Sequence, residues 1–299
     1  MKQVIRSLGS ARKIVMSRTS RLLASLALAV ALIPAALLSS SIGPKTSWAG
    51  ERIAVGGSGS PIPLTQEMAK AFLAKTPGDV VEVLPRSIGE AGGIAALSEG
   101  RIQVGIIARR PDSGEGTPDM RFRLYARVPA VVAVNVTVAG VQSLTEQQVL
   151  DIYAGRITNW KQVGGPAARI RVLTRNESDM NKRAWRLYLK GFKDLQETRD
   201  AVMLFKAHEM VAGLLNEPHA IGFTDSIGVL EGKGRLRSLS VNGIAPTPEH
   251  VASGRYWIVK DFYIVTKGEA PGLAKRFADF PFSNEGQDLI AAFGAIPVR

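Results

Sequence analysis

The sequence predicts an α/β fold of two lobes that are joined by two extended crossings of the chain. Short apolar runs alternate with amphipathic helical stretches, an order that builds a parallel sheet with helices on its faces. Two longer β-rich runs, 130–136 and 256–265, bracket the middle of the chain. We therefore expect the first lobe to take residues from both ends of the chain and the second lobe to take the middle.

The first lobe is expected to begin with the element order βαβαβ. Its strands are predicted at 53–55, 80–84 and 102–107. Its helices are predicted at 64–72, where apolar residues recur at helical spacing, and at 93–97, ending at Gly100. Residues 130–136 then carry the chain out of this lobe.

The middle of the chain contains the elements of the second lobe. Ser143-Leu144-Thr145-Glu146 predicts a capping box at the start of a helix. Strands follow at 170–173 and 220–223, with helices around Trp185 and Leu214. The second crossing, 256–265, contains Lys260-Asp261, which we expect to interrupt it, and two helices close the chain. The predicted domains are residues 50–131 with 262–299 for lobe 1 and residues 132–261 for lobe 2.

Residues 1–49 have the pattern of a cleaved signal peptide. A basic segment from Lys2 to Arg21 without acidic residues precedes the apolar run 22–38, and Ser47-Trp48-Ala49 places small residues where a signal peptidase cleaves. The alternative is an uncleaved membrane anchor, because the apolar run is just long enough to span a bilayer. Pro34 and the small residues after it favour cleavage.

Charge and cysteine content exclude several classes of function. The formal charge is +12, but seven of the basic residues lie in the first 49 positions, so the mature chain stays near +5. Its basic clusters are short and have no accompanying aromatic residues, so we expect no nucleic-acid partner. The absence of cysteine excludes a lipoprotein anchor and thiol catalysis. Export without an anchor predicts a periplasmic protein.

Two glycine-rich turns indicate an anion site. Gly57-Ser58-Gly59-Ser60-Pro61 and Ser87–Ile94 each follow a predicted strand and precede a predicted helix. Turns of this kind present backbone N–H groups and hydroxyls to an anion, and the carboxyl ends of neighbouring parallel strands are where an open α/β sheet binds ligands. The alternative is a pair of ordinary tight turns, because neither matches a P-loop or a dinucleotide fingerprint.

A third polar loop, Thr174–Asn181, follows the strand at 170–173. Arg175 could present its guanidinium fork to an oxyanion. The alternative is a solvated loop in which Ser178 or Asp179 caps the next helix. The three histidines, His208, His219 and His250, lie outside these loops, and no metal-binding or hydrolase motif is present. We expect no enzymatic activity, no cofactor and no metal.

The segment 151–165, DIYAGRITNWKQVGG, resembles the signature of the phosphate-type substrate-binding proteins of ABC importers. Shorter segments at 93–97, 108–111, 220–223, 243–256 and 283–287 occur in the same order as in that family, so the resemblance covers about residues 53 to 298. It implies a type II periplasmic binding protein fold, a small anionic ligand such as phosphate, and an inner-membrane ABC permease as partner. We expect a monomer.

The resemblance also assigns ligand contacts. Ser58 and Ser60 match the first serine-bearing loop of the family, and Arg175 matches the arginine of its Arg-…-Ser-Gly-Thr loop. Asp179-Met180-Asn181 stands in place of Ser-Gly-Thr, and Glu90-Ala91 stands in place of small hydroxyl residues. The expected ligand-binding residues are Ser58, Gly59, Ser60, Glu90, Ala91, Gly92, Arg110, Arg175, Asp179 and Asn181.

The two carboxylates in these loops are unexpected in an anion site. A carboxylate 4 Å from a bound anion repels it by roughly 4 kcal/mol per charge at an effective dielectric near 20, which corresponds to about three decades of affinity. Either Glu90 or Asp179 points away, or the ligand is not plain phosphate. The alternative function is therefore a ligand sensor or envelope docking module of the same fold that does not serve transport.

Overall fold

The computed structural model describes residues 50–109 and 118–298. All of them lie in a compact unit that runs from Ser47 to Arg299. The predicted signal peptide, residues 1–49, and the predicted ligand residue Arg110 lie outside the described residues. In the described part of the chain, no helix is both long enough and apolar enough to cross a membrane.

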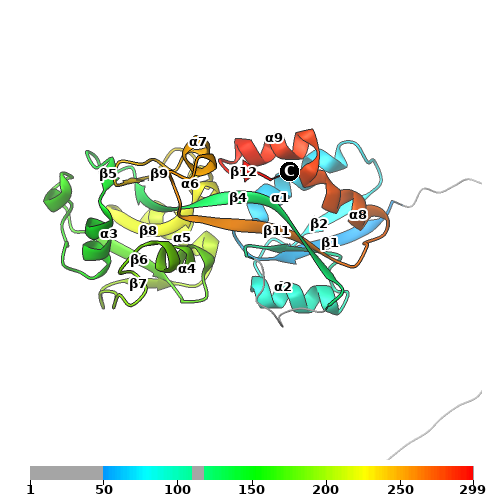
Figure 1. The fold of residues 1–299 in the computed structure, drawn as a ribbon, viewed down its shortest axis with the longest axis horizontal. Coiled ribbons are helices and arrows are strands. Elements are labelled where there is room, and N and C mark those ends of the chain that lie inside the picture. Colours follow the sequence, from blue (N-terminus) through cyan, green and yellow to red (C-terminus); the bar gives the residue numbers. More distant parts are fainter. Residues whose placement is uncertain (1–49, 110–117, 299) are drawn as a thin grey trace, which may run out of the picture. The chain divides into compact units, whose positions relative to one another are not determined.

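The main sheet has the strand order β2-β1-β3-β11-β4-β8-β6-β7 (Figure 1). Its strands are β1 Arg52–Gly57, β2 Val80–Val83, β3 Val104–Ile107, β4 Met120–Asn135, β6 Arg171–Arg175, β7 Val202–Leu204, β8 Ala220–Asp225 and β11 Val259–Lys267. Two short strands, β9 Leu236–Ser238 and β12 Ile296–Pro297, also pair with β4. A separate small sheet joins β5 Ser143–Leu144 to β10 Ser240–Val241.

Helices connect the strands of both halves of the sheet. They are α1 Ile62–Leu73, α2 Gly89–Ser98, α3 Glu146–Tyr153, α4 Met180–Tyr188, α5 Ala207–Asn216, α6 Ser226–Glu231, α7 Pro248–Ala252, α8 Gly272–Asp279 and α9 Asn284–Ala292. Two 3₁₀ turns, η1 Trp160–Val163 and η2 Phe280–Phe282, complete the described elements. The alternation of strand and helix agrees with the sequence prediction.

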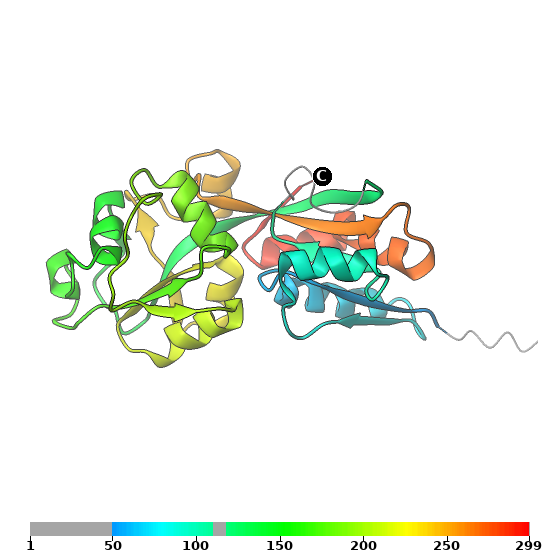
Figure 2. The same cartoon turned by 90° about the horizontal axis from the view of Figure 1, so that it is seen from below.

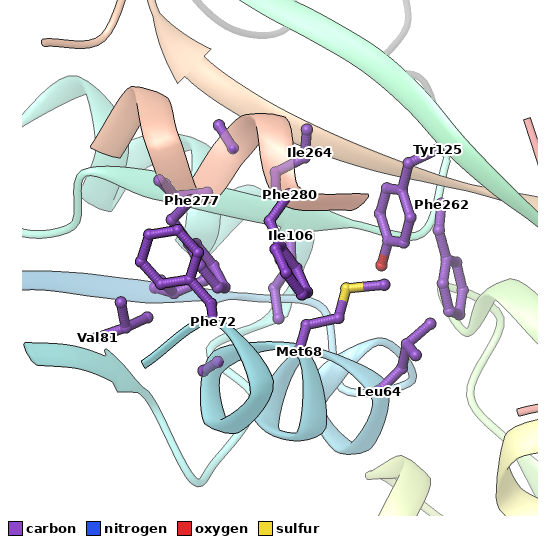
Figure 3. Close-up of a cluster of buried hydrophobic side chains, with 14 of the residues drawn as sticks. Leu64, Met68, Phe72, Val81, Ile106, Tyr125, Phe262, Ile264, Phe277 and Phe280 are labelled. Carbon is purple, nitrogen blue, oxygen red and sulfur yellow. The ribbon is translucent and has the colours of Figure 1, made fainter. Parts of the chain in front are cut away.

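One hydrophobic core lies around the strands β1, β2 and β3, which pair in parallel. Helix α1 places Leu64, Met68 and Phe72 in it, because apolar residues four apart share one face of a helix. The ring of Phe72 packs edge-to-face on Phe277 and Phe280 from the end of the chain, with centroids 5.6 and 5.7 Å apart, and Figure 3 shows Phe72 beside Phe277. The first core is therefore built from both ends of the chain.

A second core lies in the middle segment. Trp160 and Trp185 are completely buried in it. The ring of Tyr153 stacks on Phe223 with centroids 4.2 Å apart, and Trp185 stacks on the same phenylalanine at 4.8 Å. Stacked aromatic pairs add to the stabilisation that burial alone provides. Trp160 of the segment 151–165 lies in this core and Ile157 packs against it, so these two residues of the segment serve the packing of the second lobe.

Strands β4 and β11 run side by side between the two cores, and Figure 2 shows the same crossing from below. They pair antiparallel from Met120 opposite Lys267 to Pro129 opposite Val259, with a register shift between Phe262 and Tyr263. The two-lobed fold with two crossings is thus confirmed. The exact domain boundaries given above stay a prediction.

Several predicted elements differ in detail. Strand β11 is not interrupted at Lys260-Asp261, because the Lys260 ammonium lies 2.6 Å from the Asp225 carboxylate and is neutralised inside the protein. The capping box joins Thr145 to Gln148, with bonds of 3.1 and 2.8 Å, and Ser143 belongs to β5. Helix α2 begins at Gly89, four residues earlier than predicted.

Candidate functional site

A cavity of about 370 Å³ is lined by residues from both lobes. From the first lobe come Ser58, Gly59, Ser60, Ser87, Ile88, Gly89, Glu90, Ala91, Gly92, Ala108 and Arg109. From the second come Arg175, Asn176, Ser178, Asp179, Met180, Arg183, Phe205, Lys206 and Ala207. Its size lies in the range typical of small-ligand pockets.

The residues that line this cavity lie at the amino ends of four helices. Residues 58–60 precede α1, 88–92 form the start of α2, 176–180 lead into α4, and 205–207 lead into α5. Each helix amino terminus carries a partial positive charge and N–H groups without intrahelical partners. The starts of α1 and α2 also have no side-chain cap. The backbone therefore favours an anion in this cavity.

The first loop is tied to both lobes through its serines. The Ser58 hydroxyl accepts a hydrogen bond of 3.2 Å from the Ala108 N–H. The Ser60 hydroxyl accepts one of 2.8 Å from Lys260 on β11. Both hydroxyl oxygens are thus used as acceptors, and in this arrangement each hydroxyl keeps its hydrogen for another partner. These are suitable donors to an oxyanion.

The second loop lies directly against the first. A Cβ added to Gly93 of α2 would lie 2.8 Å from the Gly57 Cα, and Gly57 itself has a φ of +145°. Only glycines at these two positions let the helix start approach the loop so closely. The Ile88 N–H and the Ser87 hydroxyl both donate to the Gly57 carbonyl at 3.2 Å. The glycines of both turns therefore allow the two loops to pack closely against each other.

Arg175 is the buried cation of the cavity. It ends strand β6 and is only 5% exposed. Its Nη2 lies 2.7 Å from the Asp179 carboxylate and 3.3 Å from the Phe205 carbonyl. Its Nε and Nη1 are buried and have no hydrogen-bond partner within residues 50–109 and 118–298. Buried N–H groups without a partner are costly, so this guanidinium fork is prepared for an acceptor.

Asp179 has two structural roles in the third loop. Its side chain accepts a hydrogen bond of 3.0 Å from the Lys182 N–H, which makes it the N-cap of α4. Its other oxygen forms the ion pair with Arg175. The sequence-based estimate of repulsion treated this carboxylate as an isolated charge, whereas in the structure the Arg175 guanidinium lies beside it.

The buried Lys182 holds the backbone of the loop that carries Arg175. The Lys182 ammonium is 1% exposed and donates to the Arg175 carbonyl at 2.8 Å. It also lies 2.9 Å from the Glu197 carboxylate and 2.8 Å from the Glu177 carboxylate. Hydrogen bonding from Arg186 lowers the pKa of Glu177, which keeps that carboxylate charged. This network holds the loop backbone that carries Arg175.

Glu90 is also paired. Its Oε1 lies 2.7 Å from Arg109 Nε, and both side chains are less than one fifth exposed. Among the described residues that line the cavity, four are cationic (Arg109, Arg175, Arg183 and Lys206) and two are acidic. The excess of positive charge adds to the effect of the helix termini, so the cavity attracts anions in spite of its two carboxylates.

The structure brings together most of the residues expected from the sequence. Those that line the cavity are Ser58, Gly59, Ser60, Glu90, Ala91, Gly92, Arg175 and Asp179. Asn181 does not line the cavity. It lies in the first turn of α4 and points into the protein interior, where it is 2% exposed. Arg110 lies outside the described residues.

Sequence reasoning missed three cations of the cavity. Arg109 was visible only as part of a short basic cluster, and Arg183 and Lys206 lie in separate helical segments. Lys206 directly precedes α5 and Arg183 lies one turn into α4. A lysine before a helix start and an arginine within a helix are ordinary surface residues in a sequence. Only the meeting of the two lobes shows that they share a cavity.

No group of three or more histidine, cysteine, aspartate or glutamate side chains that could hold a metal ion occurs in residues 50–109 and 118–298. Of the three histidines, none lines the cavity. The donors and cations of the cavity suit an anion.

A family model described as a PBP superfamily domain matches residues 44–285. The phosphate-binding protein PstS of Bacillus subtilis is 28% identical over 250 residues, which cover 82% of this chain and 80% of that protein. The PstS of Borreliella burgdorferi is 26% identical over 257 residues, which cover 83% of this chain and 90% of that protein.

Solved structures show the same fold. A Clostridium perfringens structure, described as a phosphate ABC transporter substrate-binding protein with bound phosphate, is 28% identical. It matches with a TM-score of 0.71 over 83% of this chain and all of that chain. An ABC-type phosphate transport receptor from Vibrio cholerae is 24% identical and matches with a TM-score of 0.60 over 82% of this chain and 99% of that chain. The predicted type II periplasmic binding protein fold is confirmed.

Proposed function

The chain belongs to the PBP superfamily, and from this membership we propose that it binds phosphate or a related small oxyanion for an ABC importer. The observation that carries the proposal is Arg175. Two of its buried nitrogen atoms have no partner in the described part of the chain, and it lines a cavity at which four helix amino ends meet. A tetrahedral oxyanion supplies the acceptors that such a fork lacks.

The relatives support this ligand class. The curated relatives compared above are named phosphate-binding proteins, and the Clostridium perfringens structure is described as holding phosphate. The ion pairs of Glu90 and Asp179 weaken the main objection from the sequence, because an arginine offsets the charge of each carboxylate. The binding contacts would come from Ser58, Ser60 and the start of α2 on one side and from Arg175 on the other.

The two crossings provide the movement that capture requires. Strands β4 and β11 connect the lobes, and the cavity takes residues from both. Bending at the crossings would bring Arg109 and Arg175 around one anion, as in hinge closure around a ligand. The closed form is the one that we propose to be presented to an inner-membrane permease.

The remaining parts of the proposal concern location and partners. The pattern of residues 1–49 supports export through a cleaved signal peptide, and the lack of cysteine supports a periplasmic protein without a lipid anchor. We propose a monomer that acts as a binding protein rather than as an enzyme and needs no cofactor. The lobes would be residues 50–131 with 262–299 and residues 132–261.

Calorimetric titration of the mature protein with phosphate, sulfate, molybdate and small organic acids tests the proposal. We expect micromolar or tighter binding of phosphate or a related oxyanion. The Arg175→Ala variant should lose at least about two decades of affinity, since a charge-assisted bidentate contact contributes about 3 kcal/mol or more. A matched control is Arg199→Ala, which removes an arginine that does not line the cavity.

The alternative is a sensor or docking module of the same fold. It predicts no heat with any oxyanion, and this result would contradict the transport proposal. Binding that survives unchanged in Arg175→Ala would contradict the proposed site while leaving the ligand class intact. The two outcomes are distinguishable in one set of titrations.

A further inference from the structure

Lys260 is a buried cation on the second crossing. It lies on β11 opposite Val128 of β4, in the stretch where the two crossing strands pair. The residue is only 4% exposed, and a lysine is almost never buried to this extent unless it is paired. Lys260 is not among the residues that line the anion cavity. Its role must therefore be found in the groups that surround its ammonium.

Three groups surround the Lys260 ammonium. It donates a hydrogen bond of 2.8 Å to the Ser60 hydroxyl and one of 2.6 Å to the Asp225 carboxylate. The centroid of the Phe262 ring lies 5.2 Å from the same nitrogen, a distance at which a cation is attracted to an aromatic face. The ammonium is therefore held in one place by groups from three different segments of the chain.

Asp225 is itself fixed by both of its carboxylate oxygens. It is 3% exposed. Its Oδ1 accepts a hydrogen bond of 2.8 Å from the Gly228 N–H at the start of α6, while its Oδ2 faces Lys260. The carboxylate also offsets the charge of the ammonium, so the pair adds little direct attraction for an anion. Any effect of Lys260 on an anion must pass through its other hydrogen-bond partner.

That partner is the Ser60 hydroxyl. An ammonium has three donors and no acceptor, so the hydroxyl oxygen must be the acceptor in this contact. The hydroxyl hydrogen then points away from Lys260. Since Ser60 lines the anion cavity and Lys260 does not, the hydrogen is available on the cavity side. A hydroxyl that is already oriented loses less freedom when an oxyanion binds to it.

These bonds lie close to the crossing of the two lobes. Ser60 belongs to the first glycine-rich loop, whereas Asp225 ends β8 of the middle segment and pairs with Ala130 of β4. Groups next to a hinge move least when two lobes bend about it. The bonds of Lys260 are therefore expected to persist in the open protein, so that Ser60 is oriented before a ligand arrives.

We propose that Lys260 is a positioning residue of the anion site: held by Asp225, it directs the hydroxyl hydrogen of Ser60 into the anion cavity. Lys260 does not touch the ligand and raises the affinity only through Ser60. This inference rests on the proposed function, because it concerns the same cavity. It gives a role to the charged residue that was expected to interrupt the crossing.

A double-mutant cycle on phosphate binding tests the inference. Lys260→Met alone would leave the buried Asp225 without its cation and would endanger folding. It is therefore combined with Asp225→Asn, which removes the ion pair as a whole and keeps an oxygen that can cap α6. Four proteins are titrated with inorganic phosphate by calorimetry: the parent, Ser60→Ala, Lys260→Met/Asp225→Asn, and the variant that carries all three substitutions.

We expect Ser60→Ala to weaken phosphate binding about tenfold, because it removes a hydrogen bond to a charged group. Lys260→Met/Asp225→Asn should weaken it at least about threefold, because the ligand must then orient the hydroxyl itself. The triple variant should bind within about twofold of Ser60→Ala, because both changes act on one contact. Lys267→Met, at an exposed position of the same strand, is the matched control and should keep the affinity of the parent.

The outcomes separate the inference from the proposed function. Parent-like phosphate affinity in Lys260→Met/Asp225→Asn would overturn the inference and leave the proposed function standing. The same holds for a triple variant in which the two losses multiply, because the ion pair would then act on binding without Ser60. No phosphate binding by the parent protein would overturn the proposed function, and the inference with it.

Discussion

Arg175 Nη2 lies 2.7 Å from the Asp179 carboxylate, and both side chains are less than one tenth exposed. The pair joins the end of strand β6 to the N-cap of α4. It explains how a carboxylate can belong to an anion site, because the aspartate holds the arginine, whose positive charge offsets its own. The arginine still has two nitrogen atoms available to a ligand in the described structure.

The charge of Asp179 opposes the bound anion even when it is paired. Asp179→Asn removes this charge and keeps an oxygen that can cap α4. A unit charge roughly 8 Å from an anion contributes about 2 kcal/mol at an effective dielectric near 20, so we expect phosphate affinity to rise by about thirtyfold. Calorimetric titration checks this, with the exposed Asp194→Asn as control. A tenfold weaker affinity would show instead that the charge of Asp179 is needed to orient Arg175.

The Lys182 network is expected to be a main source of stability near the site. Lys182→Met removes a buried ammonium and leaves Glu197, which is 11% exposed, without its closest cation. Breaking a buried ion pair in this way costs about 3–5 kcal/mol. Chemical denaturation of the variant measures the loss. Lys190→Met, at an exposed position of the same region, should change stability by less than about 0.5 kcal/mol.

Two neighbouring glycines of α2 should respond differently to alanine. A Cβ at Gly93 would lie 2.8 Å from the Gly57 Cα, so Gly93→Ala must push α2 away from the first loop at a cost of about 1–3 kcal/mol. A Cβ at Gly92 would have the Ile88 Cβ as its nearest neighbour at 3.4 Å. Gly92→Ala should therefore keep or raise stability, by up to about 1 kcal/mol. Equal melting temperatures of the two variants would contradict the close approach of the loops.

The stability of the protein should depend on pH through Glu231. Desolvation, together with the nearby charge of Asp225, raises the pKa of Glu231 to about 7. The folded state then binds a proton that the unfolded state releases, so stability falls as pH rises from about 4.5 to about 7. Glu231→Gln should remove this loss.

The comparison of melting temperatures at pH 5 and pH 8 checks the role of Glu231. Because the side chain is partly exposed, solvent screening keeps the effect small, and we expect the variant to gain about 2–4 °C over the parent at pH 8 and nothing at pH 5. A gain of the same size at both pH values would show that the effect is not due to titration of Glu231.

The sequence predicted the elements of this fold well because they depend on local patterns. Helix α1 follows from Leu64, Met68 and Phe72 on one face, and the strand that ends at Gly57 follows from its apolar run. Strand β4 was predicted only from Ala130, whereas it starts at Met120, because its first half is half-buried and mixes charged with apolar residues. Such a strand is specified by its pairing with β11 more than by its composition.

The loops that form the site could be predicted from the sequence, but the charge balance of the cavity could not. Ser58 and Arg175 could be singled out because Ser58 follows a strand and Arg175 ends one, which is a local property of the sequence. The pairing of Glu90 with Arg109 could not be predicted from the sequence, because it joins α2 to the end of β3. The estimate of repulsion from Glu90 and Asp179 left these arginine partners out. The sign of an electrostatic effect depends on partners that only the folded chain brings together.

The most direct measurement of the central claim is a crystal structure of the mature protein grown with phosphate. We predict a phosphate in the anion cavity that accepts hydrogen bonds from Arg175 Nε and Nη1 and lies within reach of the Ser58 hydroxyl, while the Arg175–Asp179 ion pair stays intact. A cavity without phosphate at saturating concentration, or a phosphate bound elsewhere while Arg175 makes no contact with it, would contradict the claim.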